Sequence, residues 1–474
     1  MEETSGLSDR GLHPMFASFR SDDPQLVRNV DIVQVVVIAL HPNSLAAWRS
    51  SAGGNERASE DIVERLCVGI DGRAAAVHAF VSEAGRRDRL LKEIDAQRRR
   101  WPDPARRPPL FGMPIGVKDI FNVARLPTRA GSELPASAFA GDQASCVTRC
   151  RDQGALIAGK TVTAEFAFLA PGPTRNPHNL GHTPGGSSSG SAAAVAAGLV
   201  PLALGTQTVG SVIRPAAYCG VVGFTPSHGR IPTDGIVPNA PSLDTVGVFA
   251  ANVENVVTAA QTLCDAWRAS SGRASPVLGV PVGAYLKRAS REGLECLERQ
   301  VMALRAAGLT VREIPLLDDI EDVAQSLLVV NRFELARSHS GWFAEFASLY
   351  QTQSAEAIRL GQQIEPTDYA AARRHQAAFR SAMTAVMADR CIDLWLAPST
   401  TGPAPVGLTT TGDAIMNLPW SFAGMPALTI PAGSSRTQLP LGIQLVSRYQ
   451  EDEQLLEHGQ LVERVCRQMT AIQG

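Results

Sequence analysis

The sequence has no surplus of charge of either sign. Its 474 residues carry 44 Lys and Arg against 46 Asp and Glu, which gives a net charge of −2 at pH 7. Proteins that bind DNA or RNA need a basic surface to neutralise phosphates. The densest basic cluster, residues 98–107, follows a helical pattern and runs into prolines, so we interpret it as an exposed helix end. We therefore predict no nucleic-acid partner.

Metal-ligand patterns are also missing. The eight cysteines are scattered, and only Cys146 and Cys150 are close together, without a Cys-x-x-Cys or histidine pair to complete a zinc site. We interpret the cysteines as free thiols in a reducing compartment. The sequence thus predicts neither a metal nor an organic cofactor.

The N-terminal region lacks a long apolar run. Its longest one, Val35–Leu40, is far too short to span a bilayer, and no basic segment leads into an apolar stretch as in a secretory signal. We expect a cytoplasmic protein, a monomer or homodimer, that acts on a small molecule and not on a membrane.

The chain has ample material for a large core. Hydrophobic residues make up 45% of it and charged residues 19%. Neither an internal repeat nor a linker divides the later part of the chain. We predict an N-terminal extension over residues 1–55 and one large domain over residues 56–474.

Beyond Pro108 the sequence alternates between short apolar strands and helical segments. The expected strands include MPIGVKDI, GALIAGK, VPLALGT and CGVVGFT, and later LWLAP, ALTIPAG and LGIQLV. Such alternation predicts an α/β fold with a mixed, mostly parallel sheet covered by helices on both faces. Residues of about 320–390 are expected to be mostly helical.

Two motifs suggest functions that their surroundings do not support. The segment Gly154–Thr161 fits the phosphate-loop pattern, but Ala-Leu-Ile-Ala between its glycines indicates a strand, and we expect Lys160 at an exposed strand end. The segment Gly186–Gly190 fits the nucleophile elbow of α/β-hydrolases, with Ser188 as nucleophile. No strand precedes it, and the later histidines stand in no catalytic pattern.

Lys118 is unusual because it lies inside the otherwise apolar segment GMPIGVKDIFNV. A buried ammonium group is costly, and burial lowers its pKa, so Lys118 is a candidate base. The residue pattern alone leaves a second interpretation open, in which Lys118 is a surface residue paired with Asp119.

Several motifs in order along the chain resemble those of the amidase signature family. They are GVKD, GKTVTAEFA, TRNPHN, PGGSSSGSAAAVAAG, GTQTVGSVIRPAAYCGVVGFTPSHGRI and TGDAIMNLPWSFAGMPALTIPAG. The resemblance runs from about residue 57 to the C-terminus, and the number of independent motifs makes it specific.

The resemblance implies the fold of that family and a Ser–Ser–Lys triad. By motif position Ser211 is the nucleophile, Ser187 the bridging serine after a cis peptide bond with Gly186, and Lys118 the base. The backbone N–H groups of Thr208, Val209, Gly210 and Ser211 would bind the oxyanion. The implied activity is hydrolysis of a carbonyl C–N bond in an amide, carbamate (urethane) or ureide through a serine acyl-enzyme.

The nucleophile loop departs from the family's commonest pattern at three positions. Gln207 replaces an aspartate, Val209 replaces the first of two glycines, and Arg214 stands one place late. The glutamine and the arginine resemble a branch acting on malonamates and ureides, in which Arg214 would bind a substrate carboxylate. A positive φ at Val209 would be strained.

Two other functions are considered for the same fold. One is a glutamine-dependent amidotransferase subunit that works with partner chains on charged transfer RNA, and the other is a non-catalytic binding protein. The substrate is not specified by the sequence. Four aromatic residues in 327–350 either line an apolar site or form the core side of a helix pair: Phe333, Trp342, Phe343 and Phe346.

Overall fold

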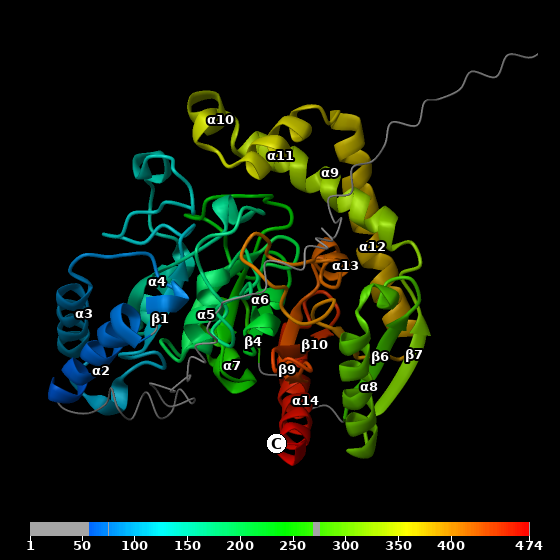
Figure 1. The fold of residues 1–474 in the computed structure, drawn as a ribbon. Coiled ribbons are helices and arrows are strands. Elements are labelled where there is room, and N and C mark those ends of the chain that lie inside the picture. Colours follow the sequence, from blue (N-terminus) through cyan, green and yellow to red (C-terminus); the bar gives the residue numbers. More distant parts are fainter. Residues whose placement is uncertain (1–55, 74, 269–274, 474) are drawn as a thin grey trace, which may run out of the picture. The chain divides into compact units, whose positions relative to one another are not determined.

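The computed structural model describes residues 56–73, 75–268 and 275–473 (Figure 1). All the described residues belong to one compact unit. The predicted extension over residues 1–55 lies outside the described residues, so the domain boundary stays a prediction.

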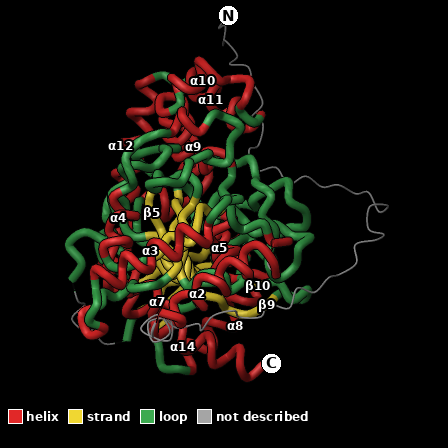
Figure 2. Tube along the Cα trace, turned by 90° about the vertical axis from the view of Figure 1, so that its left-hand side faces the viewer, coloured by secondary structure: helices red, strands yellow, loops and turns green. Residues whose placement is uncertain are grey.

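A ten-stranded sheet forms the centre of the domain, and Figure 2 shows its strands enclosed by helices. Its order is β2-β1-β3-β5-β4-β9-β10-β8-β6-β7. In chain order the strands are β1 (Pro114–Lys118), β2 (Leu156–Thr161), β3 (Leu202–Gln207), β4 (Val222–Thr225), β5 (Thr245–Ala250), β6 (Val277–Val282), β7 (Thr310–Pro315), β8 (Leu394–Pro398), β9 (Ala427–Ser434) and β10 (Pro440–Val446).

The predicted α/β fold with a mixed sheet is confirmed. Strands β2-β1-β3 on one flank and β8-β6-β7 on the other pair in parallel. The central pairs, from β3-β5 to β10-β8, are antiparallel. The expected parallel pairing therefore belongs to the flanks, where helices connect the strands, whereas central neighbours such as β9 and β10 follow each other through a short turn.

Helices cover both faces of the sheet. On β9, Thr429 lies near the α6 (Ile213–Tyr218) side, next to Gly223 and Ala216, whereas its neighbour Leu428 contacts Gly459 of α14 (Asp452–Gln473). Successive residues of a strand point to opposite faces. The helices α6 and α14 therefore lie on opposite sides of β9.

Eleven further α-helices lie in the described part of the chain. They are α2 (Glu56–Val68), α3 (Arg86–Arg100), α4 (Ser145–Asp152), α5 (Ser189–Ala196), α7 (Val253–Leu263), α8 (Arg291–Ala306), α9 (Ile320–Ser338), α10 (Ser340–Phe346), α11 (Thr352–Gln362), α12 (Pro366–Asp389) and α13 (Leu418–Ala423). The predicted helical region of about 320–390 corresponds to α9–α12. No helix in the described part of the chain is long and apolar enough to cross a membrane.

Candidate active site

The three residues of the proposed triad stand at the ends of neighbouring elements. Lys118 is the last residue of β1, Ser187 lies two residues before α5, and Ser211 lies between β3 and α6. Strand β1 pairs with β3, and at its other edge Lys118 is level with Thr161 of β2. The hydroxyl of Thr161 is 2.7 Å from Ser191 of α5, so Lys118 extends from the face of the sheet that α5 covers.

Lys118 is fully buried, and its partners are uncharged oxygen atoms. Its Nζ lies 2.8 Å from Ser187 Oγ, 2.8 Å from Thr206 Oγ1 and 3.4 Å from the Thr206 carbonyl oxygen. Burial lowers the pKa of Lys118 from its usual 10.5 to about 7, and the nearby Asp244 carboxylate opposes this shift. A large fraction of Lys118 is therefore neutral near pH 7, as a base must be.

Asp119 does not pair with Lys118. Its carboxylate lies 2.7 Å from Nζ of Lys160, and both side chains are buried. The expectation that Lys160 is exposed is therefore wrong. Lys160 belongs to β2, and its buried ammonium group also contacts the hydroxyl of Thr128. The residues between Gly154 and Gly159 are mainly strand β2, as predicted, and form no phosphate loop.

Each serine of the first glycine-rich loop has a different role. The peptide bond between Gly186 and Ser187 is cis, as the resemblance implies. The hydroxyl of Ser188 donates to the Thr206 carbonyl (3.1 Å) and accepts from the Thr206 N–H (3.3 Å), while Ser191 donates to the Leu204 carbonyl (2.8 Å). Ser188 is thus committed to the backbone of β3, which does not suit a nucleophile.

Ser211 lies beside this loop, and its side chain has no fixed partner. The Ser188 N–H donates to the Ser211 carbonyl oxygen at 3.4 Å, and Ser211 is 7% exposed. The Ser211 hydroxyl makes no hydrogen bond to another described residue. The structure therefore joins Lys118 directly to Ser187, and places the backbone of Ser211 against the residue that follows Ser187.

Backbone N–H groups around Ser211 are available as oxyanion donors. None of the N–H groups of Thr208, Val209, Gly210 and Ser211 donates to another described residue. Those of Val212 and Ile213 are already bound to Gln207 Oε1, at 2.9 and 3.0 Å.

Gln207 and Ser421 hold this loop in place. Gln207 Nε2 donates to the Ser421 hydroxyl (3.0 Å), which donates in turn to the Val209 carbonyl (2.6 Å). Neither Val209 nor Gly210 has a positive φ, so the valine is accommodated without the strain considered above. A Cβ at Gly210 would lie 2.5 Å from Asn417 Oδ1, which explains the glycine there.

Arg214 is fully buried and holds the two serine loops together. Its guanidinium donates to the Gly186 carbonyl at 2.8 Å and to the Thr411 hydroxyl at 3.1 Å. Burial lowers its pKa. These contacts give Arg214 a structural role, and its predicted contact with a substrate carboxylate stays a prediction.

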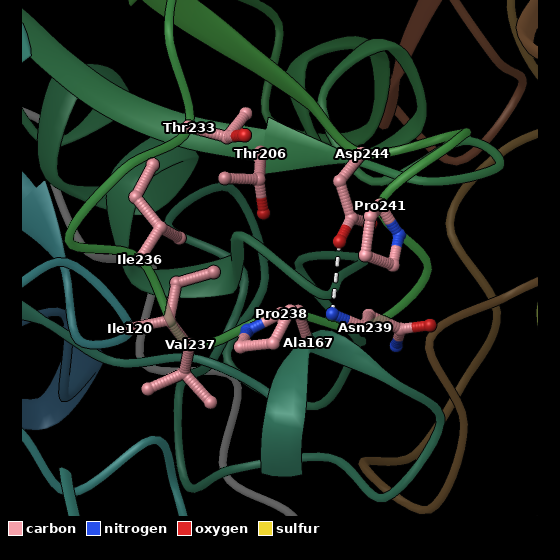
Figure 3. Close-up of a pocket in the computed structure, with 10 residues that line it drawn as sticks. All are labelled: Ile120, Ala167, Thr206, Thr233, Ile236, Val237, Pro238, Asn239, Pro241 and Asp244. Carbon is pink, nitrogen blue, oxygen red and sulfur yellow. Dashed lines mark hydrogen bonds between the residues drawn. The ribbon is translucent and has the colours of Figure 1, made fainter. Parts of the chain in front are cut away.

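A cavity of about 50 Å³ is lined in part by Thr206, which contacts Lys118, and by Asp244, and Figure 3 shows these two lining residues along one side of it. Asp244 is buried; it accepts from the Thr208 hydroxyl at 2.7 Å and from the N–H groups of Asn239 and Ala240. The other lining residues are mostly apolar: Ile120, Ala167, Thr233, Ile236, Val237, Pro238, Asn239 and Pro241. The sequence has no local signal for Thr206 and Asp244, because only the pairing of β1, β3 and β5 brings them near Lys118.

The four aromatic residues of 327–350 do not line this cavity. Phe333 stacks on Tyr369 of α12 with ring centroids 4.2 Å apart, and Phe343 packs edge-on against Tyr350 at 5.1 Å. Trp342 packs edge-on against Phe139 at 5.0 Å, and Phe346 is half-buried. Phe333, Trp342 and Phe343 are therefore packing residues, and each contacts another aromatic side chain of the fold. Among the described residues, no group of His, Cys, Asp or Glu could hold a metal ion.

Comparison with known proteins agrees with this fold. Residues 61–456 match the family described as Amidase. A curated relative, a glutamyl-tRNA(Gln) amidotransferase subunit of Synechococcus sp. (strain CC9311), is 30% identical over 470 residues, which cover 87% of this chain and 95% of that one. The corresponding subunit of Thermus thermophilus is 33% identical over 421 residues, with coverage of 78% and 86%.

Solved structures give the same result. A crystal structure of an amidase is 31% identical, with a TM-score of 0.77 and coverage of 86% of this chain and 96% of the other. The peptide amidase of Stenotrophomonas maltophilia is 26% identical, with a TM-score of 0.76 and coverage of 90% and 97%. The chain belongs to the amidase signature family of enzymes.

Proposed function

We propose that this enzyme hydrolyses a carbonyl C–N bond through an acyl-enzyme on Ser211, with Ser187 as the bridging residue and Lys118 as the base. The observation that carries the proposal is the buried Lys118, whose pKa is lowered to about 7 and whose Nζ lies 2.8 Å from Ser187 Oγ. A buried lysine without an ion-pair partner is costly, which favours a catalytic use for it.

The reaction begins with a proton transfer. Ser187 gives its proton to neutral Lys118 and takes the proton of Ser211, whose Oγ bonds to the carbonyl carbon. Charge moves to the carbonyl oxygen, where the free N–H groups of residues 208–211 stabilise it. The proton returns through Ser187 to the nitrogen, the C–N bond breaks, and an amine or ammonia leaves. Water then attacks the ester along the same proton path, which releases the acid and restores Ser211.

A fluorophosphonate with a fluorescent reporter tests the nucleophile without a known substrate. Wild type is expected to be labelled, and Ser211→Ala is not. Ser188→Ala is the matched control and should still be labelled, because the hydrogen bonds of the Ser188 hydroxyl go to the backbone of β3. Labelling that survives in Ser211→Ala but is lost in Ser188→Ala would assign the nucleophile to Ser188.

A second candidate is a glutamine-dependent amidotransferase subunit. It is favoured by the curated relatives from Synechococcus and Thermus, which are subunits of glutamyl-tRNA(Gln) amidotransferases. In both candidates water hydrolyses the acyl-enzyme. They differ in whether the released ammonia or amine leaves the protein or ammonia reacts with an acceptor that a partner subunit binds. Glutaminase activity that depends on added partner subunits would support the amidotransferase, whereas turnover of amides by the isolated chain supports the hydrolase.

The substrate class within the proposal is an amide, carbamate or ureide, to be distinguished by a hydrolysis panel of anilides, urethanes, malonamates and ureides. A cytoplasmic location is part of the proposal. It is supported by the eight cysteines, which are all free thiols, since a reducing compartment keeps thiols in that state.

A further inference from the structure

Thr206 offers two oxygen atoms to the Lys118 ammonium group. Its side-chain Oγ1 lies 2.8 Å from Nζ and its carbonyl oxygen lies 3.4 Å away. Thr206 is 3% exposed and is held in β3, which pairs with β5. The third oxygen near Nζ belongs to Ser187. Lys118 therefore has three oxygen neighbours, and one residue supplies two of them.

This arrangement has a directional consequence when Lys118 is neutral. A neutral amine has two N–H donors and one lone pair, whereas the charged ammonium has three donors. The Thr206 carbonyl oxygen can only accept a hydrogen bond, and Oγ1 is able to accept the second. With both N–H groups directed to Thr206, the remaining tetrahedral direction of Nζ, which holds the lone pair, faces Ser187 Oγ.

We propose that Thr206 is a positioning residue that turns the lone pair of neutral Lys118 toward Ser187. The inference rests on the proposed function, because it assigns Thr206 a task only if Lys118 is the base. Thr206 contacts no substrate atom in this role and acts through Lys118.

Removal of the Thr206 hydroxyl should change the rate and its pH dependence together. An oxygen acceptor stabilises the charged lysine more than the neutral one, so its loss lowers the pKa of Lys118 further below about 7. Among the described residues, Asp244 is the charged group that raises the pKa of Lys118. The neighbouring residues on the flanking elements are neutral: Thr161, Ser187 and Ser191. The labelling rate of Ser211 rises with pH as Lys118 becomes neutral. In the variant the midpoint of this rise therefore moves to lower pH, and the maximal rate falls.

The experiment measures the second-order rate of fluorophosphonate labelling between pH 5 and 10. Thr206→Val keeps the size of the side chain, and we expect at least about a tenfold lower plateau and a midpoint below that of wild type. Thr206→Ser restores the hydroxyl and should recover both values. Thr206→Ala is a second removal of the hydroxyl, to be used if the valine variant does not fold, with folding checked by circular dichroism.

Thr245→Val is the matched control. Thr245 is a buried threonine on the adjacent strand β5, and its hydroxyl donates to the Leu243 carbonyl instead of Lys118. In this variant the plateau rate should stay within about twofold of wild type, and the midpoint within about 0.2 pH unit. A folded Thr206→Val or Thr206→Ala with the wild-type midpoint, or the same losses in Thr245→Val, overturns the role of Thr206. Absence of Ser211-dependent labelling in wild type instead overturns the proposed function, so the two failures are distinct.

Discussion

The two buried lysines of the flank, Lys118 and Lys160, lie on adjacent strands and have opposite environments. Register pairs Lys160 with Val117, so the two ammonium groups are on opposite faces of the sheet. Lys160 forms an ion pair with Asp119 at 2.7 Å, whereas Lys118 has only neutral oxygens within hydrogen-bond distance. Burial lowers the pKa of both, and Asp119 opposes this for Lys160. A nearby counter-charge thus distinguishes Lys160, a structural lysine, from Lys118, the candidate base.

Loss of the base should give the largest effect. Lys118→Met is expected to reduce fluorophosphonate labelling and amide turnover by about 10²–10⁴-fold, since proton transfer is lost. Lys160→Met, if folded, should retain labelling within a few fold. Equal losses in both variants would remove the functional distinction between the two lysines.

The order reverses for stability. Lys160→Met leaves the Asp119 carboxylate buried without its partner and should lower the free energy of unfolding by about 3–5 kcal/mol in urea titrations. Adding Asp119→Asn should recover part of that loss, because the uncompensated charge is removed. Absence of recovery would mean that the ion pair is not the main contribution of Lys160.

Arg214 is a third buried cation, and like Lys118 it has neutral partners. If it also binds a substrate carboxylate, Arg214→Ala should lose about 2–5 kcal/mol in kcat/KM on an acidic substrate relative to a matched neutral one. Equal losses on both substrates would leave Arg214 with its loop-holding role alone.

The pH dependence of stability tests the lowered pKa of Lys118. Between pH 7 and 10.5 the unfolded state keeps a proton on Lys118 that the folded state has lost, so wild-type stability rises with pH across this window. Lys118→Met lacks this contribution, and its stability relative to wild type should fall by up to about 1.4 kcal/mol per pH unit there. Urea titrations at pH 6.5, 8 and 9.5 measure it, and a pH-independent difference would contradict the lowered pKa.

A smaller effect is expected at Asp244, the carboxylate that acts on Lys118 from a distance. Asp244→Asn removes a charge that raises the pKa of Lys118, so the rising limb of the labelling rate should move to lower pH. The Thr208 contact can persist through the amide oxygen. A midpoint that stays or moves upward would exclude this influence.

The sequence predicted the parts of the fold that have local signals. Strands β1–β4 and β8–β10 appear as short apolar segments, and the helices α9–α12 correspond to the region of about 320–390 that was expected to be mostly helical. Another local prediction failed. Lys160 was expected at an exposed strand end, but its side chain is buried and paired with Asp119.

Contacts between distant segments could not be predicted in this way. Lys118, Ser187 and Ser211 were found because motifs carry them. Thr206, Asp244 and the Lys160–Asp119 pair depend on the order β2-β1-β3-β5, which no spacing in the sequence encodes. The Val209 backbone likewise depends on Ser421, more than 200 residues away along the chain.

The serine-rich segment 187–191, at the start of α5, has a composition typical of a flexible linker, yet each of its serines has a defined partner. Ser187 contacts Lys118, Ser188 and Ser191 contact the backbone of β3, and Ser189 donates to the Val162 carbonyl at 3.4 Å. Low sequence complexity therefore conceals high positional specificity. Exchange of one serine for another small residue should lower the free energy of unfolding here, even where labelling of Ser211 persists. A variant library of this segment, scored for stability, would show the sensitivity of a packed core.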